Sequence, residues 1–253
     1  KPLIIFFTVM LFAITGLFLI SAGFIPAQNI SSAQSKNNKS EKLTNQSSLF
    51  YRIEFTLYND QNISSVHDSI NQLNDQFEKN YLLALEDKRK SDYISVFNRL
   101  YKLLPHYPEY YPFYDELIFS AKASNNINII GRFISENKPS NKYYNYLNAL
   151  LAYHSNKYSE AVNILKDTNE FEPLYLLSYS YRGLGDYENA LSVLKRSESF
   201  LSDKDKSRIY VSAGSLYLLS NQYNEAQNYY KKGFETAKAF GNRREEIKSL
   251  LNL

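Results

Sequence analysis

The chain has 253 residues, of which 44% are apolar and 15% aromatic, so it is long enough and apolar enough to build a sizeable folded domain. Its formal net charge is +3, with 29 Lys and Arg residues against 26 Asp and Glu residues, and this balance gives no support to nucleic-acid binding. The chain has no Cys, which excludes disulfide bonds, thiolate metal sites and a thiol nucleophile.

The N-terminal segment is apolar. Residues 3–24 carry no charged side chain, and these 22 residues are enough for a helix that crosses a bilayer. Residues 1–26 are therefore predicted to be a transmembrane helix or a cleaved signal peptide, for which Ala27 offers a small residue at the cleavage point. Lys1 favours the cytoplasmic side, so we expect the soluble part to be membrane-anchored through residues 3–24 and extracytoplasmic (periplasmic or extracellular), or secreted.

Residues 27–61 are predicted to form a flexible Ser/Asn/Lys-rich tether, because residues 27–48 have almost no apolar side chains to bury. Within this range, residues 49–58 alternate between apolar and polar. Tyr51, Ile53, Phe55 and Leu57 would share one face of a single strand.

A helical period begins at about residue 62. Ile63, Val66, Ile70, Leu73 and Phe77 follow a spacing of three and four residues and would form one apolar seam. We expect this seam to pack inside the chain; pairing with a second copy, which would make a homo-oligomer, is the alternative.

One ten-residue phrase recurs in the C-terminal half. It reads NKYSEAVNIL at residues 156–165, GDYENALSVL at 185–194 and NQYNEAQNYY at 221–230. Each copy has Tyr, then Ala three residues later, then a large apolar residue four further on, and a small residue nine positions before the Tyr. This spacing predicts two helices joined by a short turn, packed closely where the small residues face each other. The small residues are Ala149, Ser178 and Gly214 on the first helices and Ala161, Ala190 and Ala226 on the second.

The repeated pattern resembles the tetratricopeptide repeat (TPR) family. The copy at residues 210–230 has Tyr210, Gly214, Tyr217, Tyr223 and Ala226 at the family's positions, whereas the first copy lacks the leading Leu-Gly. Residues 142–240 carry the clear copies. The resemblance implies an all-α fold, an α-solenoid of helix-turn-helix TPR-like repeats.

The solenoid is expected to extend in both directions. Residues 93 and 127 match the repeat tyrosines, and the steps between positions 93, 127, 158, 187 and 223 are 34, 31, 29 and 36 residues. Residues 62–141 are therefore predicted to hold divergent TPR-like repeats and residues 142–253 clear ones. Residues 242–253 look like the first helix of a further repeat, so the C-terminus is expected to be truncated.

Catalytic patterns are lacking. The three histidines form no metal-ligand spacing, and there is no Gly-x-Ser-x-Gly elbow or Gly-rich phosphate loop. The acidic residues Asp115, Glu116, Glu160 and Glu188 lie on expected polar helix faces, where solvated charge is the ordinary interpretation. We therefore expect no enzyme activity, no metal and no cofactor.

The resemblance implies that the first helices line a concave, partner-binding surface. Its positions map to Tyr143, Tyr146, Tyr153, His154, Tyr175, Tyr179, Arg182 and Arg208, with Glu172, Ser215 and Leu218 beside them. Tyrosine and arginine suit the binding of a peptide or helix, although the tyrosines could instead pack between helices and show only an edge. The expected function is a non-catalytic, membrane-tethered scaffold that binds a partner protein or peptide and no nucleic acid. The alternative is the extracytoplasmic sensory part of a larger signalling protein whose effector domain is missing.

Overall fold

The computed structural model describes residues 45–59, 65–106, 108–137 and 141–253. This part of the chain folds into α-helices and two short 3₁₀ helices and contains no strand, so the all-α prediction is confirmed for it. The α-helices are α2 (Asn45–Asn59), α3 (Val66–Asn71), α4 (Gln76–Arg89), α5 (Tyr93–Leu103), α6 (Tyr111–Ala123), α7 (Ile127–Glu136), α8 (Lys142–His154), α9 (Tyr158–Leu165), α10 (Phe171–Gly183), α11 (Tyr187–Glu198), α12 (Ser207–Leu219), α13 (Tyr223–Ala239) and α14 (Arg243–Leu251). The 3₁₀ helices are η1 (Leu104–His106) and η2 (Asp203–Asp205).

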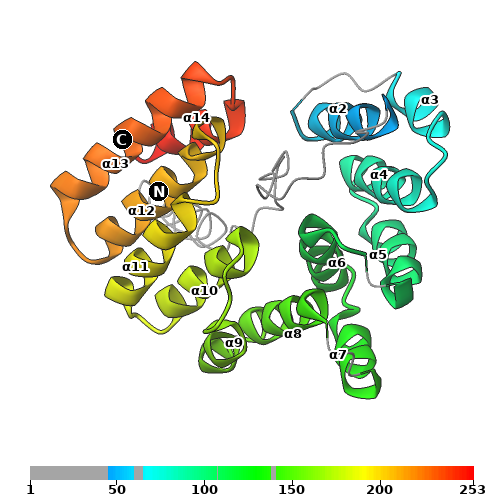
Figure 1. Cartoon of the computed structure of the whole chain (residues 1–253), viewed down its shortest axis with the longest axis horizontal. Coiled ribbons are helices and arrows are strands. Elements are labelled where there is room, and N and C mark those ends of the chain that lie inside the picture. Colours follow the sequence, from blue (N-terminus) through cyan, green and yellow to red (C-terminus); the bar gives the residue numbers. More distant parts are fainter. Residues whose placement is uncertain (1–44, 60–64, 107, 138–140) are drawn as a thin grey trace, which may run out of the picture.

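The helices from α4 to α13 form consecutive antiparallel pairs, and the pairs follow one another around an open ring (Figure 1). The second helices begin at Tyr93, Ile127, Tyr158, Tyr187 and Tyr223. These are the five positions that the repeat spacing predicted to be equivalent, so the register of the repeats is confirmed.

Each turn within a pair contains one residue in the left-handed region. These residues are Ser91, Asn125, Asn156, Gly185 and Asn221, and each lies two positions before the second helix begins. The backbone N–H that follows the left-handed residue donates to a carbonyl five residues back, as from Lys157 to Ala152 at 2.9 Å and from Gln222 to Tyr217 at 2.8 Å. This geometry closes the first helix and reverses the chain.

The predicted close approach at small residues is present. A Cβ atom added at Gly214 would lie 2.8 Å from the ring of Tyr230, which is itself buried. Ser178 donates its hydroxyl hydrogen to the Ala190 carbonyl oxygen at 2.8 Å. The paired helices can approach this closely only because these side chains are small.

The predicted strand at residues 49–58 is wrong, because these residues belong to α2. Phe50, Ile53 and Leu57 are buried in the main core, a helical spacing, whereas Phe55 is 47% exposed. The alternating pattern and the helical pattern share Ile53 and Leu57, and packing against α4 selects the helix. The same finding corrects the prediction of a flexible tether for residues 45–59.

The apolar seam is not one continuous helix. Residues 72–75 separate α3 from α4, and the Asp75 carboxylate accepts a hydrogen bond from the Glu78 N–H at 2.8 Å, which begins a new helix. Val66, Ile70 and Leu73 are buried within the chain's own core. The expectation of internal packing is therefore confirmed at these residues, and they are not available for pairing with a second copy.

No helix in the described ranges is long and apolar enough to cross a membrane. The predicted transmembrane or signal segment, residues 3–24, lies outside the described residues and stays a prediction.

Candidate functional site

The first helices of the pairs build the inner side of the ring. In Figure 1, α6, α10 and α12 face the open centre, while α7, α11 and α13 lie outside. Neighbouring first helices also contact each other, as α6 with α8, α8 with α10, and α12 with α14. The residues predicted to bind a partner lie on α8, α10 and α12.

These eight residues differ in exposure. Tyr143, Tyr146 and Tyr175 are buried, and Tyr153, His154, Tyr179, Arg182 and Arg208 are half-buried. For the three buried tyrosines the geometry matches the alternative interpretation, packing between helices. Tyr143, for example, packs against the Tyr111 ring, with the two ring centres 4.8 Å apart.

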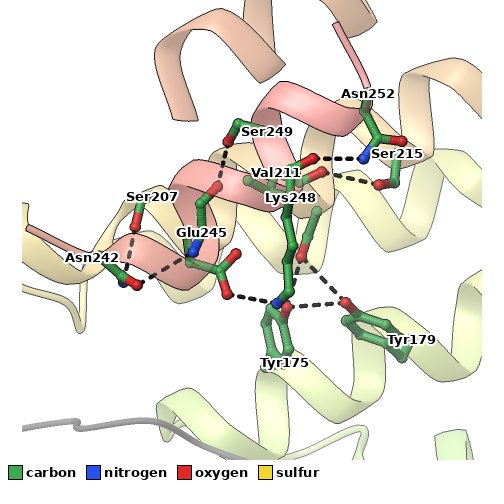
Figure 2. A network of polar contacts seen from close by, with 11 residues as sticks. Tyr175, Tyr179, Ser207, Val211, Ser215, Asn242, Glu245, Lys248, Ser249 and Asn252 are labelled. Atoms are coloured by element: carbon green, nitrogen blue, oxygen red, sulfur yellow. Dashed lines mark hydrogen bonds and ion pairs between the residues drawn. The ribbon is translucent and has the colours of Figure 1, made fainter. Parts of the chain in front are cut away.

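Tyr175 and Tyr179 of α10 meet Ser212 of α12 in a hydrogen-bonded triangle. The Tyr175 hydroxyl lies 2.6 Å from Ser212 Oγ and 3.0 Å from the Tyr179 hydroxyl, and Tyr179 lies 3.3 Å from Ser212 Oγ. Figure 2 shows Lys248 of α14 reaching down toward Tyr175. Lys248 Nζ also pairs with the Glu245 carboxylate at 2.6 Å.

Two guanidinium groups stack on these tyrosines. Arg208 lies 3.9 Å from the centre of the Tyr175 ring and 5.3 Å from that of Phe171, and Arg182 lies 4.3 Å from the Tyr179 ring centre. Nη1 of Arg208 is buried and has no hydrogen-bond partner among the described residues. Arg182, Arg208, Tyr175, Tyr179 and Ser212 are called the tyrosine–arginine cluster below.

The cluster shifts the acidity of Tyr179. Burial by itself raises the pKa of Tyr179, but the charge of Arg182 and the hydroxyls of Ser212 and Tyr175 outweigh it and lower the pKa below its ordinary value. A phenol of lowered pKa is a stronger hydrogen-bond donor. The cluster therefore offers donors, from its hydroxyls and guanidinium groups, to an incoming acceptor.

Two carboxyl groups, those of Asp115 and Glu172, lie near enough to Arg208 for its charge to act on both. Tyr146 donates to Asp115 Oδ1 at 2.8 Å, and burial raises the pKa of Asp115 to about 8. Burial likewise raises the pKa of Glu172 to about 7. The first helices therefore carry two kinds of polar group. Weakly ionised acids lie on α6 and at the start of α10, and cations lie at the end of α10 and on α12 and α14.

His154 and Tyr153 lie at the end of α8, with ring centres 5.2 Å apart. Burial and the nearby charge of Lys122 lower the pKa of His154 to about 3. The imidazole is therefore neutral at physiological pH.

Sequence reasoning missed part of this site. Ser212 and Lys248 were not predicted, although Ser212 lies one helical turn after Arg208 on α12. Asp115 and Glu116 were expected to be solvated but are buried, because neighbouring first helices cover that side of α6. Glu160 and Glu188 are exposed, as expected. No group of three or more His, Asp or Glu side chains in the described ranges could hold a metal ion.

Comparison with known proteins supports the repeat assignment. The tetratricopeptide repeat family model matches residues 171–199 and 207–240, which hold the α10–α11 and α12–α13 pairs. These two segments are therefore TPR-like in sequence as well as in structure. No curated protein sequence matches the chain.

Two solved structures of MamA are similar to this chain. One shares 17% sequence identity with a TM-score of 0.41 and covers 63% of this chain and 97% of its own. The other also shares 17% identity with a TM-score of 0.41 and covers 65% of this chain and 93% of its own.

Proposed function

We propose that the chain is a non-catalytic scaffold that binds a partner protein through the concave side of the helix pairs. Repeats of the matched family generally serve as interaction scaffolds, and the tyrosine–arginine cluster has the chemistry for this role. The observation that carries the proposal is Arg208, whose buried Nη1 lacks a hydrogen-bond partner among the described residues. The Arg208 guanidinium group as a whole is half-buried and stacks on Tyr175, so its less covered edge can donate to a carbonyl or carboxylate of a bound segment.

The half-buried residues Tyr153, His154, Tyr179, Arg182 and Arg208 are the proposed contacts. Their rings and guanidinium groups are already held by stacking, so little side-chain freedom is lost on binding. The buried Tyr143, Tyr146 and Tyr175 would support these contacts from below.

The test is affinity capture from a membrane extract with the full chain as bait. The variant Arg182→Gln, Arg208→Gln removes both stacked cations, and we expect it to lose a protein that the native chain retains. The matched control is Lys195→Gln, Lys231→Gln, which removes two exposed cations on α11 and α13 and should retain the same protein. Equal retention by both variants would contradict the proposal.

We also propose that residues 3–24 hold the scaffold at a membrane, with the repeats on the extracytoplasmic side. The support is the uncharged length of this segment and Lys1 before it. Externally added protease should digest the repeats in intact cells or spheroplasts. If the repeats are protected until the membrane is permeabilised, this location is wrong.

A further inference from the structure

Glu54 places a carboxyl group inside the N-terminal part of the fold. It lies on the inner face of α2 and is 0% exposed, like the apolar core around it. The hydroxyl of Tyr110, just before α6, donates to this carboxyl group and lies 2.8 Å and 2.9 Å from its two oxygens. Tyr81 of α4 also hydrogen-bonds to it. Side chains from two other parts of the chain therefore enclose one ionisable group of α2.

The hydroxyl groups continue from Glu54 to a second buried acid, Glu116 of α6. The hydroxyl oxygens of Tyr81 and Tyr58 are 3.4 Å apart, and Tyr58 donates to Glu116 Oε1 at 2.8 Å. Lys88 Nζ lies 2.8 Å from both carboxylate oxygens of Glu116. The charge of Glu116 is therefore balanced by a cation.

The cations on and next to α2 have other surroundings. His67 of α3 lies 2.8 Å from the Glu86 carboxylate. Arg89 of α4 donates from Nη1 to a backbone carbonyl oxygen of α2 at 3.3 Å. Arg52, on α2 itself, is exposed. Among the described residues, no ion pair joins a cation to Glu54.

Negative charge, in contrast, does act on Glu54. The charge of Glu116 disfavours its ionised form. Glu78 of α4 acts together with Glu54 on the Tyr51 hydroxyl, so a further carboxylate is close. Ionising Glu54 in the packed helix therefore buries a charge without a counter-ion.

The ionisation of Glu54 thus depends on whether α2 is packed. In the packed helix, burial raises the pKa of Glu54 to about 7, and the hydrogen bonds from Tyr110 and Tyr81 offset only part of this effect. In a separated helix the carboxyl group would be in water, with its ordinary pKa of 4.5. The packed form binds the proton more tightly, so a rise in pH from about 5 to about 7 favours separation.

We propose that α2 is a pH-sensitive cap on the α4–α5 pair, packed while Glu54 is protonated and separated from α4 when Glu54 ionises. α2 packs against α3 and α4 (Figure 1), so it can separate without disrupting the pairs from α6 onward. Separation would uncover the rings of Tyr81 and Tyr110, whose centres lie 6.0 Å and 5.8 Å from that of Phe50 on α2. This aromatic surface would be exposed more often at neutral pH than in acid.

Hydrogen–deuterium exchange of the full chain tests this proposal, from about pH 5 to about pH 8 and with each rate divided by the intrinsic rate at that pH. We expect the opening of α2 peptides to rise about tenfold for each pH unit up to about pH 7 and then to level off. Peptides from α13 should not follow this rise, because α13 does not pack against α2.

The variant Glu54→Gln keeps an acceptor for the Tyr110 hydroxyl and cannot ionise. Exchange in its α2 peptides should be slow and independent of pH once the intrinsic rate is removed. The matched control is Glu172→Gln on α10, which removes another carboxyl group whose pKa is raised to about 7. It should keep the native pH dependence in α2.

Three outcomes would overturn the proposal. The opening of α2 in the native chain could be independent of pH, it could rise equally in Glu54→Gln, or it could rise equally in α13, which would show a loss of the whole fold. The first and third outcomes need only the native chain, so the test does not depend on how well the variant folds. Because no partner protein is present, the result is independent of the concave-face proposal.

Discussion

At the scale of residues, two buried positions show how side-chain size and ionisation affect the stability of the fold. Gly214 admits the Tyr230 ring between two helices, and Asp115 holds a carboxyl group in a buried position beneath Tyr146. Single substitutions at Gly214 and Asp115 test both effects, because each changes the stability of the fold and can be measured without a partner.

Gly214→Ala should destabilise the fold by about 1–3 kcal/mol, as expected for overpacking. The new Cβ would lie 2.8 Å from two carbons of the buried Tyr230 ring, which must then shift. Urea denaturation measures the change. Gly131→Ala in α7 is the matched control, since its Cβ would meet only Leu151 at an ordinary 3.8 Å. There the higher helix propensity of Ala should keep or raise stability, and equal losses at both positions would contradict this account.

Because three carboxyl groups have raised pKa values, we expect the free energy of unfolding to fall as the pH rises from about 6.5 to about 8. The folded-state pKa values are raised to about 8 for Asp115 and to about 7 for Glu54 and Glu172, mainly by burial. The folded chain therefore holds protons that the unfolded chain has released, and loses stability as the pH rises. Below about 6.5 the lowered pKa of His154 acts in the opposite direction.

Thermal unfolding across this pH range measures the effect. Asp115→Asn keeps an acceptor for the Tyr146 hydroxyl and cannot ionise. We expect this variant to show a shallower decline than the native chain and to be the more stable of the two at pH near 8. An unchanged slope would show that Asp115 does not titrate as its burial requires.

At the scale of elements, the turns within the pairs define where each second helix begins. Gly185 has a φ of 77° and nothing near its missing Cβ, whereas Ser91 has a φ of 60° in the equivalent turn of an earlier pair. Ser91 has a Cβ atom and is therefore strained in the left-handed conformation, whereas Gly185 has none and is not.

Opposite effects on stability are therefore expected from Gly185→Ala and Ser91→Gly. The first should lower the free energy of unfolding by about 1 kcal/mol, because Ala is strained in this conformation, and the second should raise it by a smaller amount. Chemical denaturation of both variants checks the signs. Two changes of the same sign would mean that the backbone of these turns is not as described.

Elements with a repeated spacing could be predicted from the sequence, and elements without one could not. The starts of α5, α7, α9, α11 and α13 followed from the spacing of the repeats. The α2 helix was mistaken for a strand because a short apolar run fits both periods, and only contact with α4 decides between them. The break between α3 and α4 was missed because the apolar spacing continues across Asp75.

At the scale of the whole molecule, the curvature of the pairs gathers residues that are distant in sequence. Arg208 acts on Asp115, and Arg244 lies in the same cavity as Lys88. The resemblance to the repeat family placed the predicted binding positions on α8, α10 and α12, but it could not show which tyrosines are buried. That depends on how closely α6, α8 and α10 approach one another, which the repeat spacing does not determine.

Hydrogen–deuterium exchange of the full chain, alone and with a captured partner, tests the central claim of concave binding most directly. We predict that the partner slows amide exchange in peptides from α8, α10 and α12. Peptides from α9, α11 and α13 on the outer side should be unaffected. Slowed exchange confined to α9, α11 and α13 would show that the partner binds the outer surface, and would contradict the proposed role of the tyrosine–arginine cluster.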